Sequence, residues 1–453
     1  MTDALSTFCA DATVPDAETE AQLERHLLDW IGLVVGGRAN AASSRSVLDA
    51  VEALSGTNGF EGSIATDEEL ATDRVALVTG TLAHSLDFDD THRESSLHPG
   101  APVIAAALPI ARRLDVSGEE LLAAISLGYD VTCALGRAVD PDAHYARGFH
   151  LTATCGTFGA TAAAGYLREF DAETFEAAFG VNGSQAAGSL QFLENGAWNK
   201  RLHPGLAASR AVAAVELVDA GFRGSADPIE GTYGFLHGYT DAPNPEALRE
   251  IEPGAAIRET ALKPYPCCRY MHAAIDGLLA LRSELDPECI ESVTVDLPPP
   301  GIRLTGDPIE AKRRPSNFVD CQFSVPFAAA LALSRGDAGL QAFLDAQDEL
   351  DDPNLRDLMD SVEAVSTDRT AEPFPAQWSA HVVVDADGRH ERFVEHPLGE
   401  PEKPMSREDV EEKFRDLVDS AGIDRTAADA IVDAIDGFGS RPAADLFAAL
   451  DGL

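Results

Sequence analysis

The sequence has little lysine and little positive charge. Its 453 residues include five lysines, and 76 acidic residues stand against 34 basic ones, giving a formal net charge of −42. Because phosphate attraction needs basic surface, this charge argues against nucleic acid or an anionic membrane as a partner. Acid excess with scarce lysine is typical of salt-loving organisms. There, about 1 M salt shortens the Debye length to roughly 3 Å and screens repulsion between carboxylates.

Several familiar patterns are also missing. Seven cysteines are present without a Cys-x-x-Cys pair, which argues against a zinc knuckle or a disulfide framework. The glycines form neither a GxGxxG motif after a strand nor a P-loop, so no nucleotide cofactor is indicated. No apolar run approaches the roughly 18 residues that span a bilayer, and the first residues lack the basic and apolar regions of a signal peptide. We therefore expect a cytoplasmic protein.

Hydrophobic residues make up 45% of the chain, enough for a sizeable core and too many for a disordered acidic protein. Up to about residue 250, Ala, Leu, Gly and Val fill blocks of helical length, which predict a large helical domain whose helices pack on neighbours from several sides. Ser117 and Glu120 form a predicted capping box, and Gly221 a predicted helix stop. The helical blocks are Leu27–Val35, Ala76–Leu86, Ala101–Leu114, Leu121–Val139, Leu151–Leu167 and Leu206–Ala220.

From about residue 263 the pattern changes to short strands. Residues 291–297 alternate as a strand does and stop at three prolines. Residues 381–386 and 389–395 flank Asp-Gly, which is the clearest hairpin signal in the chain. A helix is predicted between these strands at 323–333.

The chain becomes helical again near its C-terminus, where Ser406 and Asp409 predict a helix start. We therefore expect a mainly α protein with an α+β insertion. Its helical domain combines residues 1–262 and 402–453, and its smaller α+β domain covers residues 263–401.

The first candidate site is the run HSLDFDDTH at 84–92, followed by HPG at 98–100. Its acids and histidines could bind a divalent metal ion, although the spacing matches no known ligand set and the three acids cannot share one helix face. They could also be structural acids of a helix-terminal turn. We favour a loop that anchors substrate and transfers protons. His98-Pro99-Gly100 precedes an apolar helix, whose free N–H groups and dipole favour a bound anion.

His150 begins a second candidate site, at the start of a helix of small residues that allow a ligand to approach closely. Alone, it would be interpreted as a capping or core histidine. Two cationic clusters accompany it, NKRLHPG at 199–205 and KPYPCCRYMH at 263–272, and each contains one of the five lysines. A merely solvated surface is the alternative, and it is a weak one in so acidic a chain.

Histidine bases beside two lysine-bearing clusters predict proton abstraction next to a carboxylate. Such a C–H group is very weakly acidic, because losing its proton adds negative charge to an existing anion. A positioned base contributes about 100- to 10,000-fold to such a reaction, and preorganised cations commonly contribute more.

These motifs resemble the MmgE/PrpD family, which includes 2-methylcitrate dehydratase, cis-aconitate decarboxylase and iminodisuccinate epimerase. The motifs at 84–100, 148–150, 199–205 and 263–272, with QFSVPF at 322–327, occur in the family's order. The resemblance implies a helical domain built from both ends of the chain and an inserted α+β lid, with the active site between them. It also implies a homodimer that needs no metal or cofactor.

The resemblance also assigns roles to single residues. Those expected to be catalytic are Asp87, His98, His150 and Lys200, with the two histidines as the acid/base pair. Those expected to bind substrate are Thr91, Lys263, Cys268, Arg269 and His272.

Two positions depart from the decarboxylase branch of the family. That branch is expected to carry a histidine five residues after the lysine that corresponds to Lys263, and this chain has Cys268 there. It is also expected to carry a tyrosine at the position of Phe327. Without them, a proton donor for the product carbon is missing, which weakens the decarboxylase interpretation.

We therefore expect a hydro-lyase that dehydrates a small tricarboxylate, in the first place 2-methylcitrate to 2-methyl-aconitate in propionate breakdown. The alternatives within the family are a dicarboxylate epimerase or racemase and a cis-aconitate decarboxylase. A metal-dependent hydrolase using the 84–98 loop is an alternative of another class, and a non-catalytic family member is the last.

Overall fold

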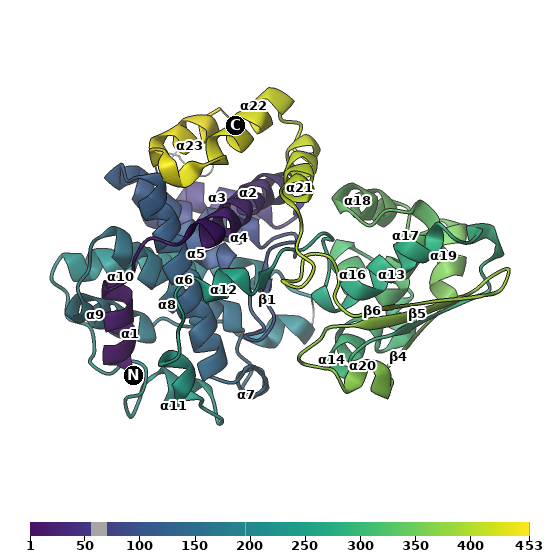
Figure 1. Ribbon diagram of the computed structural model, residues 1–453, viewed down its shortest axis with the longest axis horizontal. Coiled ribbons are helices and arrows are strands. Elements are labelled where there is room, and N and C mark those ends of the chain that lie inside the picture. The colour runs from purple at the N-terminus through teal and green to yellow at the C-terminus, as the bar shows by residue number, and fades with distance from the viewer. Residues whose placement is uncertain (56–69, 195, 453) are drawn as a thin grey trace. The chain divides into compact units, whose positions relative to one another are not determined.

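The computed structural model describes residues 1–55, 70–194 and 196–452. It divides into two compact units, coloured along the chain in Figure 1. We call Met1–Ala261 with Arg407–Leu453 the helical unit, and Leu262–Ser406 the α+β unit. The predicted fold class, mainly α with an α+β insertion, is confirmed.

In its described residues, the helical unit contains two short strands among its helices. Its longer helices are α1 (Thr2–Ala10), α2 (Ala17–Asn40), α3 (Ser44–Ser55), α4 (Thr72–Ala83), α5 (Gly100–Leu114), α6 (Gly118–Ala138), α8 (Leu151–Leu167), α9 (Ala172–Gly183), α10 (Asn199–Asp219), α21 (Arg407–Ser420), α22 (Arg425–Ile435) and α23 (Ala443–Leu450). Its short elements are β1 (Thr91–His92), α7 (Pro141–Ala146), η1 (Leu190–Glu194), α11 (Phe235–Tyr239), η2 (Pro245–Leu248), α12 (Ala255–Arg258), β2 (Thr260–Ala261) and η6 (Phe438–Ser440).

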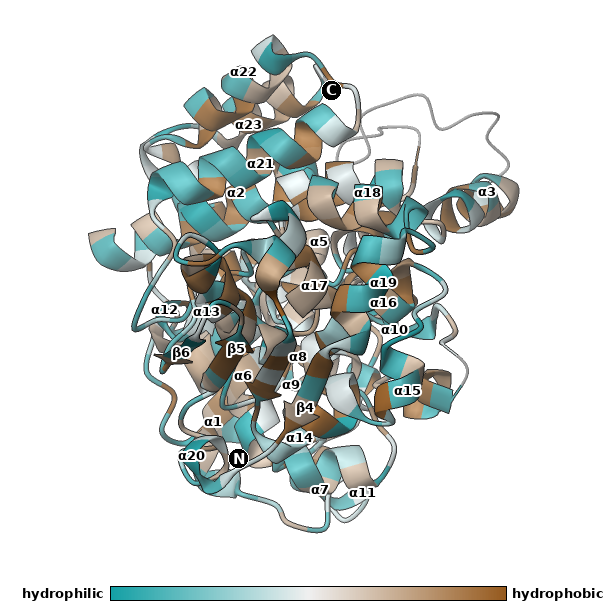
Figure 2. Ribbon diagram, turned by 90° about the vertical axis from the view of Figure 1, so that its right-hand side faces the viewer, coloured by the Kyte–Doolittle hydropathy of each residue, from teal (hydrophilic) through white to brown (hydrophobic). Residues whose placement is uncertain are grey.

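The core of the helical unit forms around α8, which packs against α5, α6 and α10. Nearly every residue of α8 is buried, and most are Ala, Gly or Thr, so neighbouring helices can approach from several sides. In contrast, α2 and α21 carry both hydrophilic and hydrophobic residues (Figure 2). By length and composition α6 could cross a membrane, yet 94% of its apolar window is buried inside the fold, as in the core helix of a globular domain.

The predicted ends of two helices are confirmed. Ser117 accepts from the backbone N–H of Glu120, whose carboxylate accepts from the N–H of Ser117, which completes the capping box. Gly221 follows the end of α10 with φ +92°, a conformation that favours glycine. The start of α10 was predicted too late. The helix begins at Asn199, so Pro204 lies inside it and Lys200 lies in its first turn.

Gly205 lets α10 cross α4 at close range. A Cβ atom at this position would lie 2.1 Å from the carbonyl oxygen of Leu77 and 2.2 Å from Oγ1 of Thr81. Because these atoms belong to the helix backbone and to a buried threonine, neither can move aside cheaply. The glycine of the 203–205 motif is therefore a packing residue that brings the first turns of α10 beside the end of α4.

We expect Gly205→Ala to lower the free energy of unfolding by about 3 kcal/mol, since overpacking a close-packed core costs of this order. Gly238→Ala is the matched control, because no heavy atom from outside its own stretch of helix lies within 4 Å of its Cβ position. Urea unfolding of both variants measures the difference. Equal stabilities would show that α4 and α10 can separate without cost.

The α+β unit contains one four-stranded sheet in the order β4-β3-β5-β6, with β3 and β4 parallel and the other pairs antiparallel. Helices α13 and α17 pack against the sheet from one side (Figure 1). The predicted strand, hairpin and intervening helix are confirmed as β3 (Ser292–Asp296), β5 (Ala380–Asp385) with β6 (Arg389–Val394), and α17 (Val325–Arg335). The other elements are η3 (Arg269–Met271), α13 (His272–Arg282), η4 (Pro287–Cys289), α14 (Pro299–Gly301), η5 (Ile302–Gly306), α15 (Ile309–Lys312), α16 (Phe318–Gln322), α18 (Leu340–Asp348), α19 (Pro353–Asp360), β4 (Val362–Val365) and α20 (Asp368–Ala371).

Candidate active site

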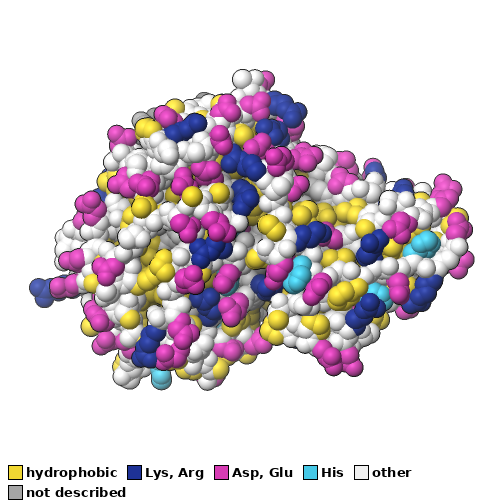
Figure 3. Space-filling view, in the orientation of Figure 1, with side chains coloured by type: hydrophobic (Ala, Val, Ile, Leu, Met, Phe, Trp, Pro, Cys, Tyr) yellow, Lys and Arg dark blue, Asp and Glu magenta, His cyan; other side chains and the backbone are white. Residues whose placement is uncertain are grey.

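The 84–100 loop connects α4 to α5 in the helical unit and is buried despite its charge. Asp87, Asp89 and Asp90 are exposed by 7%, 1% and 4%, whereas many Asp and Glu side chains lie on the surface (Figure 3). Asp87 has φ +51°, a left-handed conformation that aspartate tolerates better than most residues. Burying so many polar groups is costly unless each finds a partner, so the partners define the site.

Asp89 lies between two imidazoles. Its Oδ2 is 2.7 Å from Nδ1 of His84 and 3.4 Å from Nδ1 of His98. The same Nδ1 of His98 is 2.6 Å from the carbonyl oxygen of Asp90. A carbonyl oxygen only accepts, so Nδ1 of His98 carries the proton. In the neutral ring, Nε2 then holds the lone pair that a general base needs.

His84, Asp89 and His98 could also hold a metal ion, because each offers one ligand atom and these atoms lie within 4.8 Å of one another. The hydrogen bond between His84 and Asp89 and the contact of Asp89 with His98 account for the same closeness. Because Nδ1 of His98 carries a proton, only its Nε2 remains as a metal ligand, so the cluster fits an ion less well than it fits a proton-transfer group.

Asp90 links the loop to the surrounding helices. Its Oδ2 accepts from the Tyr129 hydroxyl at 2.6 Å and lies 3.3 Å from Nδ1 of His26, while its Oδ1 accepts from the N–H of Gly100 at 3.2 Å. Burial opposes ionisation of Asp90, but hydrogen bonds from His26 and Tyr129 outweigh it and hold the pKa of the carboxyl below its usual value. The prediction of a bound anion before α5 is thereby corrected, because Asp90 itself occupies the N-terminal end of that helix.

Gly100 makes this arrangement possible. A Cβ atom there would lie 2.4 Å from the Tyr129 hydroxyl and 2.7 Å from Oδ2 of Asp90. The glycine of the 98–100 motif therefore leaves room for the Asp90 carboxylate, in the same way that Gly205 leaves room for α4.

His150 caps the start of α8, and its Nδ1 lies 3.1 Å from Nδ1 of His203 on α10. One of these nitrogens donates and the other accepts. The ring that accepts must be neutral, so at least one of the two rings is uncharged. Burial, reinforced by nearby His203, His84 and Lys200, holds the pKa of His150 well below its usual value. Burial likewise lowers the pKa of His203 to about 4. Both imidazoles are therefore uncharged at neutral pH.

Lys200 brings a cation to the same region. Its Nζ donates to Oδ1 of Asp87 at 2.6 Å, and the two side chains are exposed by 23% and 10%. Its neighbour Arg201 points elsewhere, donating to the hydroxyl of Ser43. Lys200 and His203 are three residues apart and therefore share one face of α10.

The helical unit thus gathers four imidazoles in a row. The ring centroids are 4.8 Å apart for His84 and His98, 6.0 Å for His84 and His150, and 5.2 Å for His150 and His203. With Asp87, Asp89 and Lys200 they form what we call the imidazole cluster. It can accept a proton from a weak acid, and it can place an ammonium beside an anion.

The expected site residues of the helical unit, His98, His150, Asp87, Lys200 and Thr91, lie in this region. Thr91 pairs with Ala261 through the β1–β2 ladder, and its Oγ1 is 3.5 Å from Nδ1 of His98.

The expected site residues of the α+β unit are Lys263, Cys268, Arg269 and His272, and their roles in substrate binding stay predictions. Within that unit, Arg269 donates to Glu400 at 2.7 Å and to Nδ1 of His272 at 2.8 Å. The backbone N–H of Cys268 donates to the carbonyl oxygen of Gln322. These contacts hold the segment in place inside its own unit.

The site residues expected from the sequence do not include His84, Asp89 and His203. All three lie in the motifs at 84–100 and 199–205, so their place in the sequence near His98 and Lys200 could have identified them. His26 and Tyr129 carried no signal, because nothing in their local sequence connects them with Asp90.

His144 is a buried histidine of the helical unit that does not belong to the cluster. Its Nδ1 donates to the carbonyl oxygen of Tyr239 at 3.0 Å, so its Nε2 accepts from the hydroxyl of Thr154 at 2.9 Å. One donor and one acceptor are what the neutral ring offers. Burial lowers the pKa of His144 to about 4.

This pKa predicts acid sensitivity. The unfolded chain protonates His144 near pH 6.5 and the folded chain only near pH 4. The contribution of the neutral His144 to the free energy of unfolding is therefore fully present above pH 6.5 and is lost as the pH falls toward 4. Between pH 7 and pH 5 the loss is about 2 kcal/mol for this residue. Over the same pH interval, urea titrations should show that the free energy of unfolding of His144→Gln falls by about 2 kcal/mol less than that of the unsubstituted protein. An identical pH dependence would mean that His144 has the same pKa in the folded and the unfolded chain.

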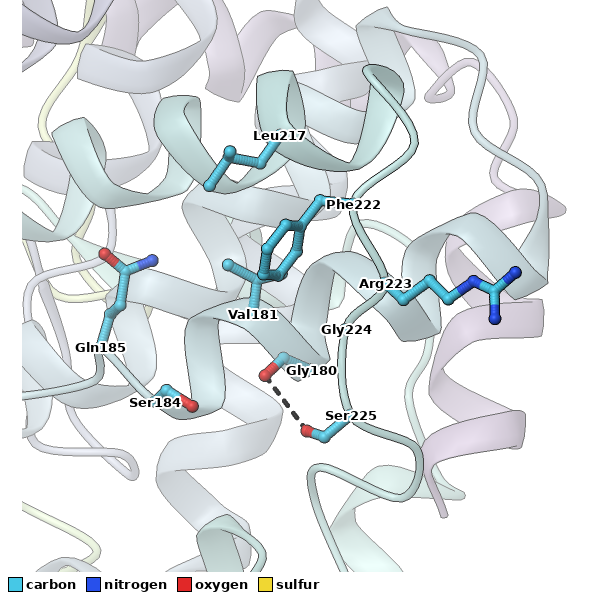
Figure 4. Close-up of a pocket in the computed structure, with 9 residues that line it drawn as sticks. All are labelled: Gly180, Val181, Ser184, Gln185, Leu217, Phe222, Arg223, Gly224 and Ser225. Carbon is cyan, nitrogen blue, oxygen red and sulfur yellow. Dashed lines mark hydrogen bonds between the residues drawn. The ribbon is translucent and has the colours of Figure 1, made fainter.

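A surface cavity of about 390 Å³ lies elsewhere in the helical unit. Leu217, near the C-terminal end of α10, and Phe222 line it together with Val181 and Gln185 (Figure 4). At 1.5 Å per helical residue, Leu217 is about 25 Å from Lys200 along α10. The cavity therefore contains no residue of the imidazole cluster, and we assign it no part in the chemistry.

Two family models match the chain. The MmgE/PrpD N-terminal domain matches residues 3–248, and the MmgE/PrpD C-terminal domain matches residues 265–436. Similar curated proteins include the cis-aconitate decarboxylase of Homo sapiens, 26% identical over 77% of this chain and 73% of the relative, and that of Aspergillus terreus, 25% identical over 78% and 76%. The cis-aconitate decarboxylase of Mus musculus is 24% identical over 77% and 72%.

Proposed function

The chain belongs to the MmgE/PrpD family, and from this premise we propose that it is a lyase that removes water from a small tricarboxylate, in the first place 2-methylcitrate. The observation that carries the proposal is the imidazole cluster. It combines His98, whose Nε2 holds the lone pair when the ring is neutral, with the neutral rings of His150 and His203 and the ammonium of Lys200.

His98 is the proposed general base. The hydrogen bond from Nδ1 to the Asp90 carbonyl fixes the ring's tautomer and orientation, which leaves Nε2 as the nitrogen that can accept a proton from a substrate. The proton it takes comes from the carbon next to a substrate carboxylate. Asp89, 3.4 Å from the same Nδ1, stabilises the imidazolium that forms.

Lys200 is the proposed carboxylate partner. In the absence of substrate its ammonium is paired with Asp87. A substrate carboxylate competes for that ammonium, and the attraction strengthens as negative charge develops during proton loss, which is how a preorganised cation lowers a barrier.

Loss of water follows from these two contacts. The C–H bond breaks toward Nε2 of His98, its electron pair forms the carbon–carbon double bond, and the neighbouring C–O bond breaks. The hydroxide takes the proton that His98 has just accepted and leaves as water, and His150, whose ring is neutral, is the second proposed acid/base residue. The substrate thus loses H⁺ and OH⁻ as water, and the cluster returns to its starting protonation state.

Decarboxylation of cis-aconitate is the second candidate, favoured by the names of the relatives. It requires a proton donor for the carbon that loses CO₂. Cys268 stands where the decarboxylase branch is expected to carry histidine, and the fully buried ring of Phe327 packs on Phe343 where a tyrosine is expected. These departures support water loss over CO₂ loss. The assembly as a homodimer and the cytoplasmic location stay predictions.

A substrate panel tests the proposal. The purified protein, kept in high salt, is mixed in turn with 2-methylcitrate, citrate and cis-aconitate, and alkene absorbance and CO₂ release are recorded together. We expect alkene formation without CO₂ from a citrate-type substrate. CO₂ release from cis-aconitate without any dehydration would replace the first candidate with the second. Proton exchange with heavy water, with neither product, would favour an epimerase.

A chelator arm tests the metal-dependent alternative built on the same loop. We expect the activity to survive dialysis against a strong chelator, because each proposed step uses side chains of the chain itself. Loss of activity that returns with a divalent ion would assign the chemistry to a metal on His84, Asp89 and His98.

A further inference from the structure

Lys413 is buried in the helical unit, far along the chain from the imidazole cluster. It lies on α21, which packs along α2 (Figure 1), and it is exposed by 6%. Its Nζ pairs with Oδ1 of Asp29 at 2.7 Å and donates to the carbonyl oxygen of Phe88 at 2.9 Å. The same ammonium lies 3.8 Å from the centre of the Phe88 ring.

Phe88 stands between the two acids that contact the reactive groups. Asp87, before it, pairs with Lys200, and Asp89, after it, contacts His84 and His98. The Phe88 carbonyl belongs to the peptide group that leads into Asp89, so a bond to it fixes the plane from which the Asp89 side chain departs. Lys413 thus contacts both the backbone and the ring of the residue that sets the direction of two acids.

Stability alone does not account for this lysine. Moving an ammonium and a carboxylate out of water costs several kcal/mol per ion, and apolar residues of similar volume in their place are often neutral or stabilising. A buried pair whose ammonium also holds a loop carbonyl has a positional role that an apolar pair could not fill.

We infer that Lys413 is a positioning residue of the active site: it holds the 87–89 turn so that Asp89 orients His98 and Asp87 meets Lys200. The positioning itself is inferred from the contacts of Lys413 with Asp29 and Phe88. Its effect on catalysis rests on the proposed function. It places the segment after the α+β insertion in direct control of a loop more than 300 residues earlier.

The test replaces the buried pair as a unit. The double variant Asp29→Asn/Lys413→Met removes both charges together, so no uncompensated charge stays buried. Glu24→Gln is the matched control. Glu24 also lies on α2 and holds the C-terminal segment, through the N–H of Phe438 at 2.7 Å and Arg407 at 3.6 Å, without touching the loop.

We expect the double variant to lower kcat by tenfold or more while KM changes less than threefold, because the base is misplaced and the Lys200 ammonium remains. Glu24→Gln should keep kcat within twofold at a comparable loss of melting temperature. An unchanged kcat in the folded double variant, or an equal loss of kcat in both variants, would overturn the inference.

A second readout does not depend on activity. In ¹⁵N-histidine-labelled protein, the bond from Nδ1 of His98 to the Asp90 carbonyl predicts a slowly exchanging Nδ1 proton, assigned by its absence in His98→Asn. We expect this signal to be lost or broadened in the double variant and kept in Glu24→Gln. If the signal is unchanged, Lys413 does not position His98. If it is lost while the unsubstituted protein dehydrates no tricarboxylate, the positioning stands and the proposed function fails.

Discussion

Replacing His98 by asparagine is expected to lower kcat by about 100- to 10,000-fold, the contribution of a positioned general base. Asparagine keeps an N–H donor near the position of Nδ1, so the bond to the Asp90 carbonyl can persist while the accepting nitrogen is lost. The fold should therefore survive the change that removes the chemistry. Steady-state rates on the best substrate of the panel measure the effect.

His237→Gln is the control for this variant, because His237 is exposed on the short helix α11 and has no place in the cluster. It should leave kcat within twofold. If His98→Asn retains more than a tenth of the activity, the base is another residue, and His150 becomes the first to replace, since its lowered pKa also leaves it neutral.

Replacing Lys200 by methionine is expected to lower kcat/KM by about 100- to 1,000-fold, as removal of one preorganised donor to a developing anion does. The variant also leaves Asp87 without its cation in a site where its side chain is only 10% exposed. Without the lysine, the negative charge of Asp87 would repel an anionic substrate. The double variant Asp87→Asn/Lys200→Met removes this repulsion. It should recover part of KM but not kcat, because the stabilising ammonium is still missing.

Lys403→Met controls for the loss of a lysine as such. Lys403 is 54% exposed and pairs with Asp276 at 3.3 Å, an arrangement that contributes little to stability. We expect unchanged kinetics. Equal activity losses in Lys200→Met and Lys403→Met would point to net charge, and not to a specific contact, as the cause.

Local signals in the sequence were sufficient for much of the fold. The Ser117–Glu120 capping box and the Asp387-Gly388 hairpin act through neighbours in the chain, so their structures follow from a few residues. The alternation of apolar blocks then separates a helical region from an α+β region. The start of α10 was missed because the apolar block begins at Leu206, whereas the first turns of the helix carry the polar residues of the 199–203 run.

The site was predictable only where its residues share a motif. Histidine and lysine next to small-residue helices marked His98, His150 and Lys200. The partners that decide their chemical states come from distant segments: Tyr129 on α6 holds Asp90, and Lys413 on α21 holds Phe88. No periodicity relates such residues, because the packing of α2, α6 and α21 around the loop brings them together. The same packing supplies Asp90 as the anion at the start of α5, where the sequence suggested a ligand.

The central claim is that the imidazole cluster binds the carbon acid with its carboxylate on Lys200. A crystal structure with propane-1,2,3-tricarboxylate, which has the expected carboxylates and no leaving group, tests it most directly. The account predicts one carboxylate within hydrogen-bond distance of Nζ of Lys200, displacing Asp87, and a carbon next to it about 3.5 Å from Nε2 of His98. A ligand bound in the cavity beside Phe222, or anywhere that leaves the Asp87–Lys200 pair closed and His98 untouched, would contradict it.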